Sequence, residues 1–355
     1  MVDYILNGVA HGSVAKRLMK SGFDVNALRP YIGDDGRSYV TMQVNGEPTA
    51  VPLVGNNATD ATLRIRQWQE LDETVIDVSK QRLIAFNRLR SYPGSYTIRG
   101  GLGKTILQHQ TMSDISRATI SMDGKRRSES DRPVFDTTNF PLPIIHKDFE
   151  FGIRELDASQ QNGGDPLDTS TARLAIQRCA EEVEFLTLGL GTFSYGGGTI
   201  YGFMNYPQRI TRVITSPEAS GWTPATLIQE VMQMRQDSKD AFHYGPWDLY
   251  MGTAWDTYLD DDYKATYNSD TLRSRIKMIN GIQEIISVDY ISGYDAILVQ
   301  RTPDVARPII AMDMTVMEWA SLDGMQMNYK VMCMLYPQLR CDHNGNTGIV
   351  HGSPA

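Results

Sequence analysis

The amino-acid sequence predicts an α+β protein, and three observations carry that prediction. Residues 60–90 and 165–189 repeat apolar side chains every three or four positions, as amphipathic helices do. Residues 96–146 are rich in β-forming runs, and from residue 216 onward helical and strand patterns alternate. Together these patterns indicate helices packed against sheets.

Composition and charge exclude several classes of protein. Of 355 residues, 41% are hydrophobic and 21% are charged, ordinary values that exclude a disordered chain, a collagen-like fibre and a coiled coil. The formal net charge is −8, and the longest block of Lys and Arg is residues 125–127. Because a sequence-reading nucleic-acid protein needs a basic face, this balance disfavours such a function.

The cysteines and the hydropathy pattern favour a reducing compartment. Cys179, Cys333 and Cys341 are odd in number and lack the spacing of zinc ligands, so we expect neither a disulfide framework nor structural zinc. The N-terminus has no basic segment before a long apolar core, and no run reaches the ~18 apolar residues of a membrane span. We therefore expect a cytosolic product without membrane contact.

The first 60 residues lack the periodic apolar positions that a core of their own would need. One short helical pattern covers residues 14–20, and polar segments with glycine and proline follow at 33–36 and 45–48. We expect an extended arm that lies on another part of the protein.

A long helix is predicted next, over residues 60–90. Trp68, Leu71, Val75 and Val78 recur at three- and four-residue spacing, so one face should be buried. The Ser-Tyr-Pro-Gly segment at 91–94 ends the pattern, because proline removes a backbone donor and clashes with the preceding turn.

Residues 96–146 form a long β excursion with a polar tip at 123–131. Its β-rich runs cover 105–111, 117–122, 133–136 and 143–146. An isolated hairpin of this length is marginal in water, so we expect a neighbour, such as another subunit, to stabilise it.

The clearest helix follows. Asp165 suits the N-cap, Pro166 suits the first helical position, and Gly189 ends the pattern. About 23 residues long, the helix should span ~35 Å. Its apolar stripe consists of Ala172, Ile176, Cys179, Val183 and Leu186.

The remaining chain indicates a body of about a hundred residues, α+β or α/β, that could form a second domain. Helices are predicted over 223–235, 253–259 and 270–279, and strands over 247–251, 283–288 and 296–300. Apolar residues alternate from Met325 to Leu335, which predicts a strand that closes a sheet begun earlier.

Residues 99–105 end in the Gly-Lys-Thr of a phosphate-binding loop. That motif also requires a glycine five residues before Gly103, and Ile98 occupies the position. We therefore interpret the segment as a hinge leading into the β excursion. Glycines 196–198 likewise indicate a turn.

The sequence contains no recognisable catalytic, cofactor or metal site. Asp260, Asp261 and Asp262 carry oxygen ligands that Ca²⁺ and Mg²⁺ prefer, but EF-hand spacing and its turn glycine are missing, so we interpret a solvated loop. The six histidines are scattered without zinc-ligand spacing, and no Gly-x-Ser-x-Gly is present. A site built from scattered residues stays open, because catalytic groups converge in space.

Five features of the sequence follow one another in a distinctive order. They are the helix containing Gln-Trp-Gln-Glu-Leu-Asp at 67–72, the return of the excursion through 140–149, the helix starting near Pro166, the glycine-containing turn at 196–205, and the C-terminal segments 302–305 and 347–349. This order resembles that of encapsulin shell proteins and of tailed-phage major capsid proteins with the Hong Kong 97-type fold. The resemblance covers roughly residues 62–350, and residues 1–60 resemble the N-terminal arm of the phage proteins.

The resemblance implies a division of the chain. Residues 1–90 would be the N-terminal arm and helix, 91–146 the extended β-hairpin loop, 147–215 with 326–355 the peripheral domain with its long spine helix, and 216–325 the axial domain.

The resemblance also implies contact residues. The loop tip would lie over a neighbouring subunit, and the acidic loop would lie near the five- and six-fold axes. The residues concerned are Lys125, Arg126 and Arg127 at the tip, Asp260, Asp261 and Asp262 in the acidic loop, and Ile176, Cys179, Val183 and Leu186 in the core of the spine helix. No lysine–asparagine cross-link between subunits is predicted.

The function that the resemblance implies is mechanical and not enzymatic. Many copies would form hexamers and pentamers of an icosahedral virion shell, assembled in the host cytoplasm around double-stranded DNA without sequence-specific binding. A portal protein and a decoration protein are expected partners, and since the sequence begins at Met1 any scaffold is expected to be a separate protein. The alternatives are an encapsulin-like compartment that stores cargo protein, and an α/β enzyme.

Overall fold

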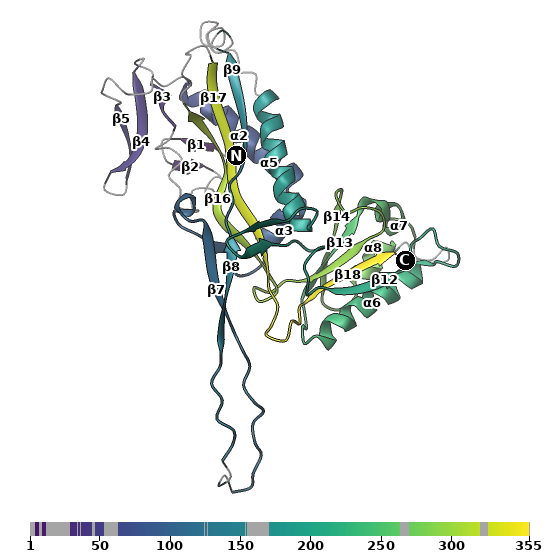
Figure 1. Ribbon diagram of the computed structural model, residues 1–355. Helices are drawn as coiled ribbons and strands as arrows, with labels where there is room; N and C mark the ends of the chain where they lie inside the picture. Colours follow the sequence, from purple (N-terminus) through teal and green to yellow (C-terminus); the bar gives the residue numbers. More distant parts are fainter. Residues whose placement is uncertain are drawn as a thin grey trace.

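The structure, a computed structural model, describes residues 4–6, 9–11, 29–33, 35, 37–44, 47–52, 63–123, 125, 127–152, 154, 170–262, 270–319 and 326–354. Two lobes, each built around a sheet, lie side by side, and a long hairpin projects from the first lobe (Figure 1). Among the described residues, no helix combines the length and the hydropathy needed to cross a bilayer. The helix predicted over 14–20 lies outside these residues.

The N-terminal arm contains two small sheets. Strands β1 (Tyr4–Leu6) and β2 (Val9–His11) pair with each other, and β3 (Tyr31–Ile32), β4 (Ser38–Val44) and β5 (Glu47–Pro52) form a three-stranded sheet. The arm is held to the first lobe at Arg29, whose Nη1 lies 2.8 Å from an oxygen of buried Asp72 and whose Nε donates to the Val316 carbonyl at 2.9 Å. For this segment, the prediction that the arm lies on another part of the protein is confirmed.

The helix predicted over 60–90 is two helices, and the single-helix prediction is wrong at Leu83. Helix α2 covers Ile65–Arg82, and α3 covers Ile84–Arg90. Leu83 leaves the helical conformation with φ −89° and ψ 70°. The physical reason is Glu184, whose buried carboxylate accepts hydrogen bonds from the Ala85 and Phe86 amides at 2.5 and 3.1 Å and so caps a new helix start.

A four-stranded sheet forms the framework of the first lobe. Its order is β6 (Tyr96–Thr97), β16 (Ala306–Trp319), β17 (Gln326–Leu339) and β9 (Ile145–Gly152). The predicted alternation along the C-terminal strand is confirmed, because Tyr329, Val331, Cys333 and Leu335 are all buried in one core cluster.

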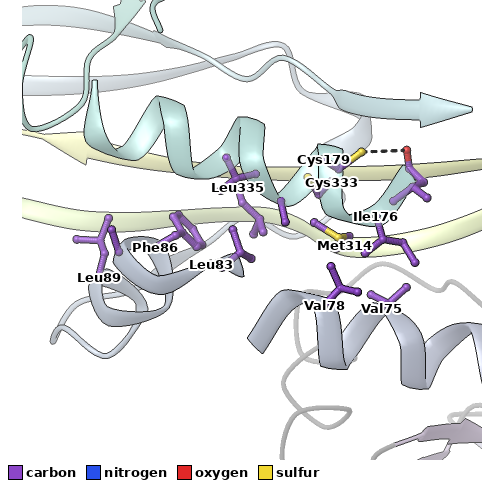
Figure 2. Close-up of a cluster of buried hydrophobic side chains, with 14 of the residues drawn as sticks. Val75, Val78, Leu83, Phe86, Leu89, Ile176, Cys179, Met314, Cys333 and Leu335 are labelled. Carbon is purple, nitrogen blue, oxygen red and sulfur yellow. Dashed lines mark hydrogen bonds between the residues drawn. The ribbon is translucent and has the colours of Figure 1, made fainter. Parts of the chain in front are cut away.

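Helix α5 (Ser170–Leu188) packs on this sheet and against α2 and α3 (Figure 1). Figure 2 shows the core that they enclose, where Ile176 of α5 points toward Val75 and Val78 of α2. The Cys179 thiol of α5 is directed instead at the Val331 carbonyl of β17, 4.0 Å away. The helix ends as predicted, with Gly189 at φ +92°. Asp165 and Pro166 lie outside the described residues.

The second lobe is a mixed five-stranded sheet with helices. Its strand order is β12 (Ile210–Ile214), β18 (Ile349–Pro354), β15 (Ala296–Gln300), β13 (Trp247–Gly252) and β14 (Ile282–Val288). The helical elements are α6 (Pro224–Asp240), η3 (Thr253–Trp255), α7 (Asp256–Leu259) and α8 (Leu272–Lys277). The helices and strands predicted between residues 223 and 300 are confirmed.

The strand pairings do not follow the expected boundaries between the peripheral and axial domains, which lie between residues 215 and 216 and between residues 325 and 326. Strands β12 and β18 fall in the expected peripheral segments, yet they pair with β15 in the second lobe. Strand β16 falls in the expected axial segment, yet it pairs along its length with β17 in the first lobe. The reason is that these pairings join distant parts of the chain, which local sequence patterns do not record.

Candidate assembly surfaces

The most prominent surface feature is the hairpin, defined here as residues 106–141. Its strands β7 (Ile106–Met112) and β8 (Phe135–Pro141) pair from Ile106–Pro141 to Met112–Phe135, and the Ser113 amide still donates to the Val134 carbonyl at 2.9 Å. Beyond that point the two legs run on without a ladder (Figure 1). The strand predicted over 117–122 is therefore wrong, because the structure has no strand at these residues.

The hairpin carries large apolar side chains that nothing in the described chain covers. Ile120 is 92% exposed and Met122 is 106% exposed, the fully solvated limit. Met112, Ile115, Val134 and Phe135 are also exposed. A group of large exposed apolar side chains on one projecting element is typical of an interaction site. A partner that buries these side chains would gain about 1.5–3 kcal/mol for each one.

The basic tip is only partly described. Lys125 and Arg127 are exposed, and Arg126 lies outside the described residues. The Lys125 amide donates to the Asp123 carboxylate at 3.3 Å, but in the described part of the chain no carboxylate lies within 4 Å of either side-chain cation. These charges remain available for a contact with another molecule.

The base of the hairpin is pinned to the first lobe by close backbone approaches. Gly101 opens the short helix η2 (Gly101–Gly103), and a Cβ at this position would lie 2.5 Å from the Ala311 carbonyl oxygen on β16. On the other side, a Cβ at Gly198, in the hairpin formed by β10 (Phe193–Tyr195) and β11 (Gly198–Ile200), would lie 2.1 Å from the Asn139 carbonyl oxygen. The Gly-Lys-Thr segment is thus part of a tight turn that anchors the hairpin.

The acidic loop lies between α7 and α8, as the sequence indicates. Arg273 donates to Asp260 at 2.9 Å and to Asp256 at 2.7 Å, while the Asp261 carbonyl accepts from the Leu272 amide at 3.1 Å. Asp262 forms an isolated bridge with Thr271. In the described residues no group of three His, Cys, Asp or Glu side chains could hold a metal ion.

The four core residues proposed for α5 are all buried, but they face two clusters. Ile176, Cys179 and Val183 belong to the core shared with α2, α3 and β17. Leu186 belongs to a second cluster with Phe140 and Ile98 at the base of the hairpin. Burial raises the pKa of the Cys179 thiol to about 12, so this cysteine stays protonated and unreactive.

A buried charge cluster between the two lobes was not predicted. Arg88 on α3 reaches the fully buried Asp248 on β13 and also contacts Glu284 of β14 at 2.5 Å. Arg301 lies 3.6 Å from the same aspartate. Nearby, the hydroxyls of Tyr92 and Tyr250 share a hydrogen bond of 3.0 Å. None of these residues stands in a motif, so sequence patterns carried no signal for the cluster.

Glu184 is a second group that sequence analysis missed, and here a signal existed. The residue lies four positions after Ala180 and eight after Ile176, within the apolar stripe of α5. A carboxylate on a buried helix face requires a partner, and the α3 amides supply it.

Known proteins of similar structure and sequence are shells. The virus-like particle from Pyrococcus furiosus superposes with a TM-score of 0.58 at 18% identity, covering 81% of this chain and 99% of the particle's chain. The capsid of Myoviridae phage XM1 superposes with a TM-score of 0.59 at 10% identity, covering 77% and 92% of the two chains.

In sequence, the type 1 encapsulin shell protein EncA of Myxococcus xanthus is 25% identical over 209 residues, which are 58% of this chain and 66% of the relative. The structural similarities show that this chain has the Hong Kong 97-type capsid fold, as the order of its elements predicts. Residues 56–352 match the family of unknown function DUF6260, and the chain therefore belongs to that family.

Proposed function

We propose that this protein is a shell-building subunit, the major capsid protein of a tailed phage, which assembles into hexamers and pentamers of an icosahedral shell around double-stranded DNA. The observation that carries the proposal is the hairpin, whose legs carry exposed apolar side chains and have no backbone ladder beyond Ser113 and Val134. Such an element gains stability only against another molecule. The shared fold of a phage capsid and a virus-like particle supports a second copy of the chain as that molecule.

The other contact surfaces follow from the same proposal. The tip of Lys125, Arg126 and Arg127 lies over a neighbouring subunit, and the loop of Asp260, Asp261 and Asp262 lies near the five- and six-fold axes. The position of this loop at one end of the second lobe, with Asp260 exposed, supports the second placement. A structure of the assembled shell that puts the loop away from the symmetry axes would end that part of the proposal.

The division of the chain is part of the proposal in an amended form. The first lobe, with the sheet of β6, β16, β17 and β9, serves as the peripheral domain, and the second lobe, with β12 and β18 included, serves as the axial domain. The strand pairings support this amended grouping. The work of the protein is mechanical, with portal, scaffolding and decoration proteins as separate partners in the virion.

An encapsulin-like compartment is the second candidate, and the sequence similarity to the encapsulin shell protein favours it. The capsid and the encapsulin-like compartment would both form closed particles, and the two proposals differ in what the particles contain. The test is to express the full chain alone, examine it by electron microscopy, and then measure the nucleic acid and protein inside native particles. Particles filled with DNA support the capsid, particles filled with a second protein support the compartment, and a small soluble oligomer would refute both.

A further inference from the structure

A cavity of about 380 Å³ lies under the base of the hairpin. It is lined by His109 and Thr111 of β7, by Thr138 of β8, and by Gln338 and Arg340 at the end of β17. The volume is several times the ~30 Å³ that one water molecule occupies, so a small ion with some water fits. The cavity therefore lies where the hairpin meets the body.

Two guanidinium groups near this cavity form no ion pair with the described residues. The Nε of Arg307 donates to the Gln338 side-chain oxygen at 2.6 Å, and its guanidinium lies over the Tyr96 ring at 4.8 Å. Arg340 makes one long contact, from Nη1 to the Pro303 carbonyl at 3.5 Å. In the part of the chain that the structure describes, no carboxylate lies within 4 Å of either guanidinium, whereas Arg88, Arg90 and Arg273 all have one.

Burial and the positive charges near the cavity lower the pKa values of Arg307 and His109. Burial and the charge of Arg340 lower the pKa of Arg307. Burial, followed by the charges of Arg340 and Arg307, lowers the pKa of His109. Like charges held together in a partly buried place cost free energy, and a bound anion removes that cost.

The one acidic residue in the described lining, Asp342, makes no ion pair within 4 Å with either guanidinium. Its carboxylate accepts from the Asn344 and Asn346 amides at 2.9 and 2.7 Å. Gln338 is only 1% exposed, and its Nε2 has a single long contact, to His109 Nδ1 at 3.4 Å. A buried amide donor thus faces the cavity without a full hydrogen bond.

We propose that this cavity binds a phosphate-sized oxyanion, with the Arg340 guanidinium as the main ligand and with the Gln338 amide and the His109 ring as further donors. Guanidinium groups bind phosphate and sulfate through paired charge-assisted hydrogen bonds. Bound there, the anion links β7 to the end of β17 and so holds the hairpin to the body. The proposal does not depend on the shell function, since binding is a property of the single chain.

Calorimetric titration of the full chain with inorganic phosphate, at constant ionic strength set by chloride, tests the proposal. Wild type should give saturable binding at one site per chain. Arg340→Gln, which keeps a hydrogen-bonding side chain but removes the charge, should weaken binding at least tenfold. Arg173→Gln, on the exposed face of α5 away from the cavity, is the matched control and should bind as wild type does.

DNA also contains phosphate groups, so a competition experiment is needed to distinguish DNA from free phosphate as the ligand. If a duplex oligonucleotide displaces phosphate from the site, the ligand is a backbone phosphate, and if it does not, the ligand is the free ion. Absence of saturable binding in wild type, or equal binding by wild type and Arg340→Gln, would overturn the proposal. Should Arg340→Gln fail to fold, an experimental wild-type structure in phosphate decides: density within hydrogen-bonding distance of the Arg340 guanidinium supports the site, and an empty cavity refutes it.

Discussion

Arg88 and Asp248, 160 positions apart, join the two lobes through two hydrogen bonds of 2.6 and 2.8 Å. The aspartate is fully buried and the arginine side chain is 20% exposed. A buried pair of this geometry adds little compared with apolar residues, but removing one partner leaves a charge without compensation. The pair therefore makes the position of one lobe relative to the other sensitive to a single substitution.

Arg88→Met should lower the free energy of unfolding by about 3 kcal/mol, because Asp248 then stays buried and, among the described residues, keeps one cation within 4 Å, Arg301 at 3.6 Å. Urea denaturation of the full chain measures the change. Arg275→Met, at an exposed position on α8, is the control and should change stability by less than about 0.5 kcal/mol. A loss below about 1 kcal/mol for Arg88→Met would contradict the role of the pair.

Glu184 should make stability depend on pH. Burial raises the pKa of its carboxyl from 4.5 to about 7, in spite of the hydrogen bonds from the α3 amides. The folded state then binds a proton that the unfolded state has released, so between pH 4.5 and about 7 this group's contribution to stability falls as pH rises.

Comparing wild type with Glu184→Gln isolates this effect. The advantage of wild type over the variant should grow by up to about 3 kcal/mol from pH 8 to pH 5, as urea titrations at each pH would measure. Glu182→Gln, exposed on the same helix, should show no such trend. A pH-independent difference for Glu184→Gln would mean that the carboxyl titrates normally.

Two glycines of the short helix η2, at the base of the hairpin, test whether this segment packs closely against β16. Gly101→Ala places a Cβ 2.5 Å from the Ala311 carbonyl oxygen, whereas a Cβ at Gly103 meets nothing within 4 Å. Gly101→Ala should therefore cost about 1–3 kcal/mol of stability, and Gly103→Ala should be close to neutral. Thermal unfolding of the two variants checks this, and equal melting temperatures would show that the turn is not pinned to β16.

The basic tip can be tested through its dependence on salt. Replacing Lys125, Arg126 and Arg127 with glutamate should weaken assembly more at low salt than at high salt, because exposed charges are screened over ~8–10 Å. Light scattering during assembly, at several salt concentrations, measures the effect. If the variant assembled like wild type at low and high salt, the tip would not contact a neighbouring subunit.

Local patterns were enough to predict most elements of this fold. The helix from Pro224 and the strands at 247–252 and 296–300 follow from apolar periodicity and from proline at a helix start. The break at Leu83 was missed because its cause, Glu184, lies about a hundred positions further on and acts only after α5 has packed. The pairing of β18 with β15 was not predicted for a similar reason, because the two strands are about fifty positions apart in the sequence.

The candidate surfaces were predicted less completely. The hairpin and its polar tip followed from β-rich runs around 123–131. The exposure of Ile120 and Met122 could not be predicted, because the sequence pattern indicates a strand at 117–122 and the structure has none there. The cavity at Arg340 and the Arg88–Asp248 pair could not be predicted, because each joins side chains from separate elements that meet only in the folded chain.

Replacing the exposed Ile115, Ile120 and Val134 with serine should leave the subunit folded and raise the concentration needed for assembly at least tenfold, because each side chain loses about 1.5–3 kcal/mol of burial against its neighbour. Thr119→Ser and Ser128→Ala, which alter the hairpin without removing a large apolar side chain, are the controls. Circular dichroism confirms that each variant is folded.

Sedimentation velocity of the wild-type chain beside this triple serine variant shows whether the apolar side chains of the hairpin hold the subunits together in a shell. We expect large closed particles for wild type and for the control variants, and single subunits or isolated hexamers and pentamers for the triple variant at the same concentration. A wild-type chain that sediments only as a small oligomer, or a triple variant that forms particles as readily as wild type, would contradict this expectation.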